Sequence, residues 1–99
     1  MSMDAPSRHA LRIIRQCVDA EHYRLLPHFR QRMAQRGLVW PDLLAVLEDP
    51  AQVRADGHDR YHRPKWIVSG TAPDELPVEF VCVIDEDDQG NVTVFITIY

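Results

Sequence analysis

Cysteine is scarce in this sequence, and long apolar runs are missing. Cys17 and Cys82 are the two cysteines among 99 residues, and each stands among apolar neighbours in a separate predicted element. This pattern predicts buried free thiols in a reducing compartment, while a single disulfide between the two stays open as the alternative. No apolar segment approaches the ~20 residues that span a bilayer, and residues 1–7 lack the apolar centre of a secretory signal. We therefore expect a cytoplasmic protein that does not associate with a membrane.

An excess of positive charge is also missing. The 11 Lys and Arg residues face 15 Asp and Glu residues, and the net charge of −4 argues against a general nucleic-acid binder. The basic residues are nevertheless concentrated. Seven arginines lie between Arg8 and Arg36 with Asp19 and Glu21 as the only acids, and residues 60–65 add three basic residues without an acid. This separation predicts a locally positive surface, or, as the alternative, helix faces whose arginines are simply solvated.

The composition is otherwise that of a folded globular domain. Hydrophobic residues make up 45% of the chain and charged residues 26%, which is ordinary globular usage. A chain of this length forms one domain with one modest core, and no repeat or linker divides it. We predict a single domain over residues 7–99, preceded by a flexible N-terminal tail over residues 1–6.

Three helices are predicted in the first half of the chain. Ser7 is placed to cap a helix that runs to about residue 20, because apolar residues there recur every three or four positions. Pro27 and Gly37 bracket a second helix, since proline fits the first turn and glycine ends a helix in the left-handed conformation. A third helix begins near Pro41 and stops at Pro50.

After residue 50 the apolar period changes from helical to two. A short strand at Val53, a long strand over residues 61–70, and a hairpin of residues 78–84 and 92–98 are predicted. Alternation on the last strand directs four side chains toward the core (Val92, Val94, Ile96 and Ile98). The predicted fold is α+β, with N-terminal helices packed on one face of a three- to four-stranded antiparallel sheet.

Several of these features recur together in a known family. The sequence has the element His28-x₃-Arg32-x₃-Arg36-Gly37-Leu38, then a short helix ending in Glu48-Asp49-Pro50, a strand at Tyr61, and a last strand Val94-Phe95-Ile96-Thr97-Ile98-Tyr99. Over residues 25–99 this resembles a widespread bacterial family of small uncharacterised domains. Its members look like relatives of the RelE-like and MqsR-like toxins, which are often encoded beside a small zinc-binding, helix-turn-helix antitoxin.

The resemblance implies a fold, an activity and partners. It implies a RelE-like sheet with helices on one side. It also implies the toxin of a type II toxin–antitoxin system, an endoribonuclease that cuts mRNA without a metal, with RNA bound free or on the ribosome. A cognate antitoxin protein is the implied protein partner.

His28, Arg32 and Arg36 are spaced by four and therefore form one ridge on the second helix. A histidine beside two arginines is suited to bind a phosphate and to hold a proton donor next to it. The alternative is structural, with the arginines paired to acids such as Asp42 or Glu48. Each step of four turns the ridge toward the apolar stripe, so we expect Arg36 at the edge of the core and favour the structural role for it.

A second cluster follows on the strand over residues 61–70. In a regular strand Tyr61, Arg63 and Lys65 share one face and His62 the other. Thr97 and Tyr99 lie opposite the apolar face of the last strand. Five side chains are therefore expected on the open face of the sheet (Tyr61, Arg63, Lys65, Thr97 and Tyr99).

This set suits cleavage of an RNA backbone. The reaction needs a base for the 2′-hydroxyl, cations for the charge on the phosphorane, and an acid for the leaving 5′-oxygen. Arg63 and Lys65 are the candidate cations. His62 or His28 is the candidate acid or base. A tyrosine, Tyr61 or Tyr99, is the substitute or a stacking platform. The alternative is a solvated strand whose basic side chains cover apolar neighbours.

Metal and cofactor sites are not expected. His58, Asp59 and His62 are possible ligands, but they span a turn rather than one helix face, and the sequence has no phosphate-cradling glycine loop and no serine nucleophile motif. Two other functions stay open beside the ribonuclease. One is a non-catalytic binding or regulatory module of the same fold, and the other is a general protein-interaction domain.

Overall fold

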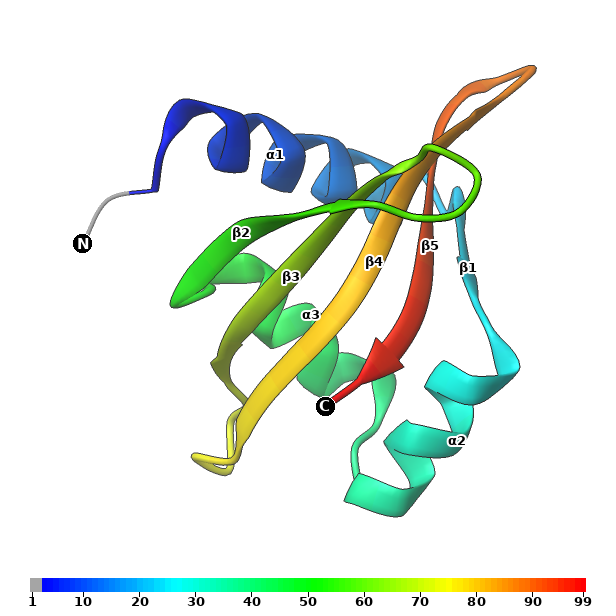
Figure 1. The fold of residues 1–99 in the computed structure, drawn as a ribbon. Helices are drawn as coiled ribbons and strands as arrows, with labels where there is room; N and C mark the ends of the chain where they lie inside the picture. Colours follow the sequence, from blue (N-terminus) through cyan, green and yellow to red (C-terminus); the bar gives the residue numbers. More distant parts are fainter. Residues whose placement is uncertain (1–2) are drawn as a thin grey trace.

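The structure, a computed structural model that describes residues 3–99, is α+β with its helices in the first half of the chain (Figure 1). The elements in chain order are α1 (Ala5–Asp19), β1 (Tyr23–Leu25), α2 (Pro27–Arg36), α3 (Trp40–Glu48), β2 (Gln52–His58), β3 (Pro64–Thr71), β4 (Pro77–Asp87) and β5 (Gly90–Ile98). None of the helices in this described part is long and apolar enough to cross a bilayer.

The strands form one five-stranded mixed sheet in the order β1-β5-β4-β3-β2. The four longer strands pair antiparallel, and β1 pairs parallel with β5. The prediction of a three- to four-stranded, purely antiparallel sheet is therefore wrong in strand number and in the direction of one edge. A three-residue strand is too short to show alternation, and its partner lies at the far end of the chain.

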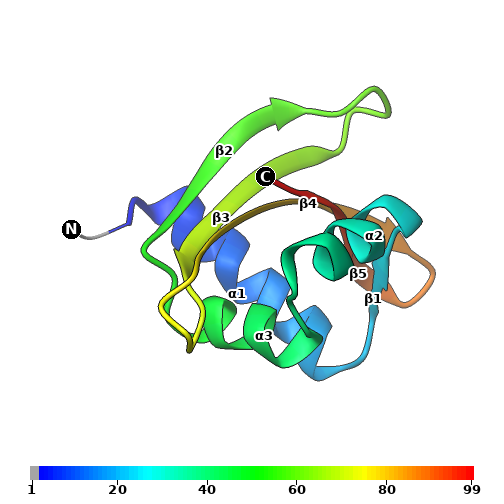
Figure 2. The ribbon, with the colours of Figure 1, turned by 90° about the horizontal axis from the view of Figure 1, so that it is seen from below.

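The helices supply the core on one face of this sheet. Figures 1 and 2 show α1 and α3 on the same side of the sheet, and α2 packs against β5 near the β1 edge. Phe29 of α2 meets Phe80 of β4 edge to face at 6.2 Å and Phe95 of β5 at 5.5 Å, and all three rings are fully buried. Aromatic packing across the interface therefore fixes α2 on the sheet.

The first helix begins earlier than predicted. Asp4 is its N-cap: the backbone N–H of Ser7 donates to Asp4 Oδ1 at 2.8 Å, and Ser7 itself is buried in the first turn. The prediction that Ser7 is the cap is wrong, because Asp4 is an equally good cap residue and allows Pro6 to lie in the first turn, where proline fits. Within the predicted tail, Ala5 and Pro6 are helical, and residues 1–2 lie outside the described residues.

The second helix has the predicted bounds. Pro27 occupies its first turn, and Gly37 ends it in the left-handed conformation at φ 67°. The N–H of Leu38 donates to the carbonyl oxygen of Met33 at 2.9 Å, which satisfies an acceptor at the helix end. The predicted proline and glycine signals are confirmed.

A bulge in β5 reverses the faces predicted for the residues that precede it. Val81 pairs with Thr97 but Cys82 pairs with Phe95, so Ile96 is an extra residue. Phe95 therefore points to the helix-covered face, to which strict alternation had assigned Val94 and Ile96. Val92 and Val94, predicted to point toward the helices, lie on the other face, although both are buried as predicted.

The strand predicted over residues 61–70 also begins later. Pro64 is the first residue of β3, and Tyr61, His62 and Arg63 belong to the connection from β2. Proline lacks an N–H and is tolerated where a strand starts. The preceding β2, predicted as a short strand at Val53, extends to His58, with a register irregularity between Ala55 and His58 and Gly57 at φ 71°.

Candidate functional site

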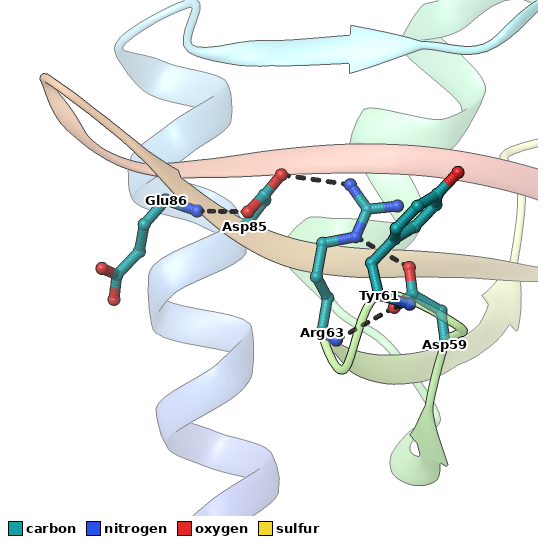
Figure 3. A network of polar contacts seen from close by, with 5 residues as sticks. All are labelled: Asp59, Tyr61, Arg63, Asp85 and Glu86. Atoms are coloured by element: carbon teal, nitrogen blue, oxygen red, sulfur yellow. Dashed lines mark hydrogen bonds and ion pairs between the residues drawn. The ribbon is translucent and has the colours of Figure 1, made fainter.

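The sheet face that carries no helix collects the five side chains predicted to share it. Lys65 is opposite Val83, and Thr97 is opposite Val81, on the strands' face away from the buried Cys82 and Phe80. Tyr99 follows β5, and its N–H donates to the carbonyl oxygen of Glu79 at 2.9 Å. The other two side chains, Tyr61 and Arg63, belong to the connection between β2 and β3. This connection brings them over β4 and β5, with α1 behind the sheet (Figure 3).

Arg63 is the centre of a polar network on this face. Its Nε donates to Asp59 Oδ2 at 2.7 Å, and its Nη1 donates to Asp85 Oδ2 at 3.1 Å. Asp59 Oδ1 also accepts the backbone N–H groups of Tyr61 and Arg63, both at 2.9 Å. The Tyr61 ring lies 5.1 Å from the guanidinium carbon of Arg63 (Figure 3). One carboxylate thus organises the whole connection.

The pKa values of both carboxylates are lowered. Desolvation raises the pKa of Asp59, but hydrogen bonds from Arg63 and Tyr61 outweigh it. The backbone N–H of Glu86 and the Arg63 guanidinium lower the pKa of Asp85. Both groups are therefore ionised at neutral pH, and two negative charges face the one positive charge of Arg63.

The other cations of the open face are paired as well. Lys65 Nζ lies 3.3 Å from Asp56 Oδ2, and Arg54 Nη1 lies 3.5 Å from Glu79 Oε2. Arg63 and Lys65, the predicted cations of the cleavage site, therefore already have carboxylate partners. This face offers little excess positive charge to a phosphate backbone.

The two predicted histidines lie apart. His62, at φ 63°, is exposed and lines a cavity of about 520 Å³ with His9 of α1 and Asn91 at the start of β5. His28 is exposed in the first turn of α2. The start of this helix lies beside the C-terminal half of β5, because the N–H of Leu26 donates to the carbonyl oxygen of Phe95 at 3.1 Å. The structure therefore does not bring His28 and His62 together for acid and base roles.

On α2 the structural role belongs to Arg32 rather than Arg36. Arg32 is half-buried, and its Nε donates to the carbonyl oxygen of Ile98 at 2.8 Å. Arg36 is exposed, so the prediction that it borders the core is wrong. Within residues 3–99, Arg36 makes no ion pair with Asp42, whose side chain accepts the N–H of Val39.

The structure adds a feature that the predicted site missed. Residues 22–41, which include β1 and α2, contain no Asp or Glu, whereas the rest of the chain holds 7 of the 11 basic residues and all 15 acids. None of the basic residues of β1 and α2 forms an ion pair among the described residues. We call this group the basic edge: Arg24, His28, Arg30, Arg32 and Arg36.

The basic edge lies at one margin of the sheet, because β1 is the edge strand and α2 follows it directly. The charge of Arg24 contributes to the lowered pKa values of Asp85 and Asp87, so its electrostatic influence reaches the open face. The absence of acids between Glu21 and Asp42 was the sequence signal for Arg24 and Arg30, which the spacing of four along α2 left out. Across residues 3–99, no three His, Cys, Asp or Glu side chains gather into a possible metal site.

Comparison with known proteins identifies a family for this chain, but the family has no described activity. A family profile described as "Domain of unknown function (DUF4258)" matches residues 25–99, which include the basic edge except Arg24 and the sheet from the end of β1 onward. No curated protein and no solved structure matches the chain.

Proposed function

The chain belongs to the family described as a domain of unknown function (DUF4258), and from its own surface we propose that it binds single-stranded RNA through the basic edge. The observation that carries the proposal is the acid-free stretch of β1 and α2 in a chain whose remaining residues are strongly acidic. A phosphate backbone is attracted to that margin and repelled from the rest of the surface, which orients the bound strand.

Single strands suit this margin better than a duplex. Arg32 donates to the carbonyl oxygen of Ile98, so the guanidinium is held beside the end of β5, next to Tyr99. Tyr99 is 52% exposed, and its ring offers a surface on which an unpaired base can stack. The resemblance to RelE-like and MqsR-like toxins favours RNA over DNA as the strand.

The test is fluorescence anisotropy with a labelled single-stranded RNA and a DNA of the same sequence. Arg36→Glu is expected to weaken RNA binding by at least tenfold, since it reverses an exposed charge of the basic edge. Arg54→Glu is the matched control, because it makes the same charge change at a residue already beside Glu79. Equal weakening by both variants would show that net charge, rather than this margin, governs binding.

RNA cleavage is the second candidate function. We propose that the basic edge and Tyr99 form a metal-independent endoribonuclease site of the RelE-like or MqsR-like toxin kind. The 2′-oxygen attacks phosphorus as its proton goes to a base, and the 5′-oxygen leaves with a proton from an acid, giving a 2′,3′-cyclic phosphate. Arg32 and Arg36 supply the positive charge, and His28 and Tyr99 are the candidates for proton transfer. The supporting observation is that Arg32 is anchored to the carbonyl oxygen of Ile98, the residue before Tyr99, whereas Arg63 and Lys65 have carboxylate partners.

Induced expression with inspection of total RNA tests cleavage separately from binding. We expect the RNA to be fragmented even in the presence of a chelator. Fragmentation is expected to be lost in Tyr99→Phe and Arg32→Ala and kept in Lys65→Ala. If the RNA stays intact while the protein is folded and binds RNA, the ribonuclease proposal is rejected and the protein is a non-catalytic binding module. The RelE-like fold assignment and the antitoxin partner stay predictions, and co-purification with the product of a neighbouring gene tests the latter.

A further inference from the structure

A second surface feature is a cleft between the C-terminal half of α1 and the outer side of α3. Its volume is about 520 Å³, within the range of cavities that take a small ligand or a few side chains. Three elements and one connecting residue line it: Arg15, Val18, Asp19, Glu21, Tyr23, Trp40, Leu44, Leu47 and Glu48.

The floor of the cleft is apolar and firmly supported. The rings of Tyr23 and Trp40 lie 5.1 Å apart, and Trp40 also meets the buried Phe95 edge to face at 5.2 Å. Leu44 and Leu47 of α3 continue this floor. Because the aromatic pair is braced by the core, the cleft offers a preformed surface for an apolar side chain.

The rim of the cleft is acidic. Asp19, Glu21 and Glu48 are exposed, and their carboxylates form no hydrogen bond or ion pair within the part of the chain that the structure describes. Arg15 is the one cation at the rim. Its Nε donates to the carbonyl oxygen of Leu47 at 2.7 Å and its Nη2 to that of Glu48 at 2.6 Å. The guanidinium therefore serves the end of α3 and leaves three carboxylates to face a ligand.

We infer that this cleft docks a basic amphipathic segment of a protein partner. The partner's apolar side chain fills the aromatic floor, and its flanking lysines or arginines meet the three rim carboxylates. Charge complementarity decides the occupant, because the same carboxylates repel a nucleic acid or an acidic peptide. The inference does not depend on the RNA proposal, since it uses a different surface of opposite charge.

The test uses the full chain with Trp66→Phe, which leaves Trp40 as the single tryptophan. Among residues 3–99 the indole Nε1 of Trp66 has no hydrogen-bond partner, so phenylalanine leaves no acceptor stranded. The probe is a short amphipathic peptide of leucine and lysine, and the comparison peptide carries glutamate in place of every lysine. The leucine–lysine peptide is expected to change the emission of Trp40 saturably, and the glutamate peptide is expected to leave it unchanged.

Two charge reversals locate the binding. Glu48→Lys is expected to weaken the leucine–lysine peptide by at least tenfold, whereas Asp88→Lys, the same change in the β4–β5 turn, is expected to alter its affinity by less than twofold. Circular dichroism confirms that each variant is folded. The inference is overturned if the leucine–lysine peptide leaves Trp40 emission unchanged, if the glutamate peptide binds as well, or if the two reversals act alike.

Discussion

Ion pairing decides what the basic residues of this protein are free to do. The sequence presents Arg63 and Lys65 as an exposed cationic pair, but carboxylates lie within 3.3 Å of both side chains. The i,i+4 partner Asp59 was near in sequence, yet residues 59–63 form a loop, where that spacing alone predicts no contact. Asp85 reaches Arg63 only through the pairing of distant strands, which the sequence does not give. The sequence therefore predicted that Arg63 and Lys65 are positively charged, but it did not predict that carboxylates neutralise them.

The Arg63 network makes stability depend on pH in the acid range. The pKa of Asp59 is lowered in the folded protein from its ordinary 3.8, so its contribution to stability is complete well above pH 3.8. That contribution is lost as the pH falls through 3.8 toward the folded-state pKa. Asp59→Asn is expected to lower the melting temperature by a few degrees at pH 7 and by much less at pH 3.

Thermal denaturation followed by circular dichroism between pH 3 and 7 measures this difference. Asp88→Asn, in the exposed β4–β5 turn, is the control and is expected to run parallel to the unmodified protein. An Asp59→Asn deficit of the same size at both ends of the pH range would mean that Asp59 acts as a hydrogen-bond acceptor and not through its charge.

Among the elements, local signals were sufficient where the determinants lie within one segment. The bounds of α2 follow from Pro27 and Gly37, both of which act on their own turn of the chain. Two features depend on distant partners and were not predictable: the parallel addition of β1 to β5, and the extra residue Ile96. The bulge moves Phe95 into the core, so a pattern of strict alternation assigns the wrong face to half of β5.

The end of α2 gives a prediction about backbone conformation. Gly37 has φ 67°, and a Cβ built on it would meet nothing within 4 Å, so only the left-handed backbone disfavours a side chain there. Gly37→Ala is expected to destabilise the protein by about 1 kcal/mol in urea unfolding. Gly37→Asn is expected to cost less, because asparagine tolerates this conformation. If the alanine variant unfolds at the same urea concentration as the parent, α2 does not end in the left-handed cap.

At the scale of the whole molecule, the charge is divided between surfaces. The chain carries −4 overall, yet β1 and α2 are free of acids while carboxylates line the α1–α3 cleft and interleave with the cations of the open face. Net charge argues against a general nucleic-acid binder, but it averages over surfaces that face different directions. The acid-free run from residue 22 to 41 was visible in the sequence, but its placement along one margin of the sheet required the fold.

This division predicts how RNA affinity responds to salt. If the four arginines of the basic edge each neutralise one phosphate, log K for a single strand falls against log salt with a slope of about −2.8, because each contact contributes about −0.7. Affinity is then about fiftyfold lower at 200 mM than at 50 mM salt. Arg30→Ala with Arg36→Ala is expected to halve the slope, and Arg54→Ala is expected to leave it unchanged. Anisotropy titrations over that salt range decide the matter. A slope near zero in the parent protein would mean that RNA is held by contacts other than phosphates, which the basic edge alone does not explain.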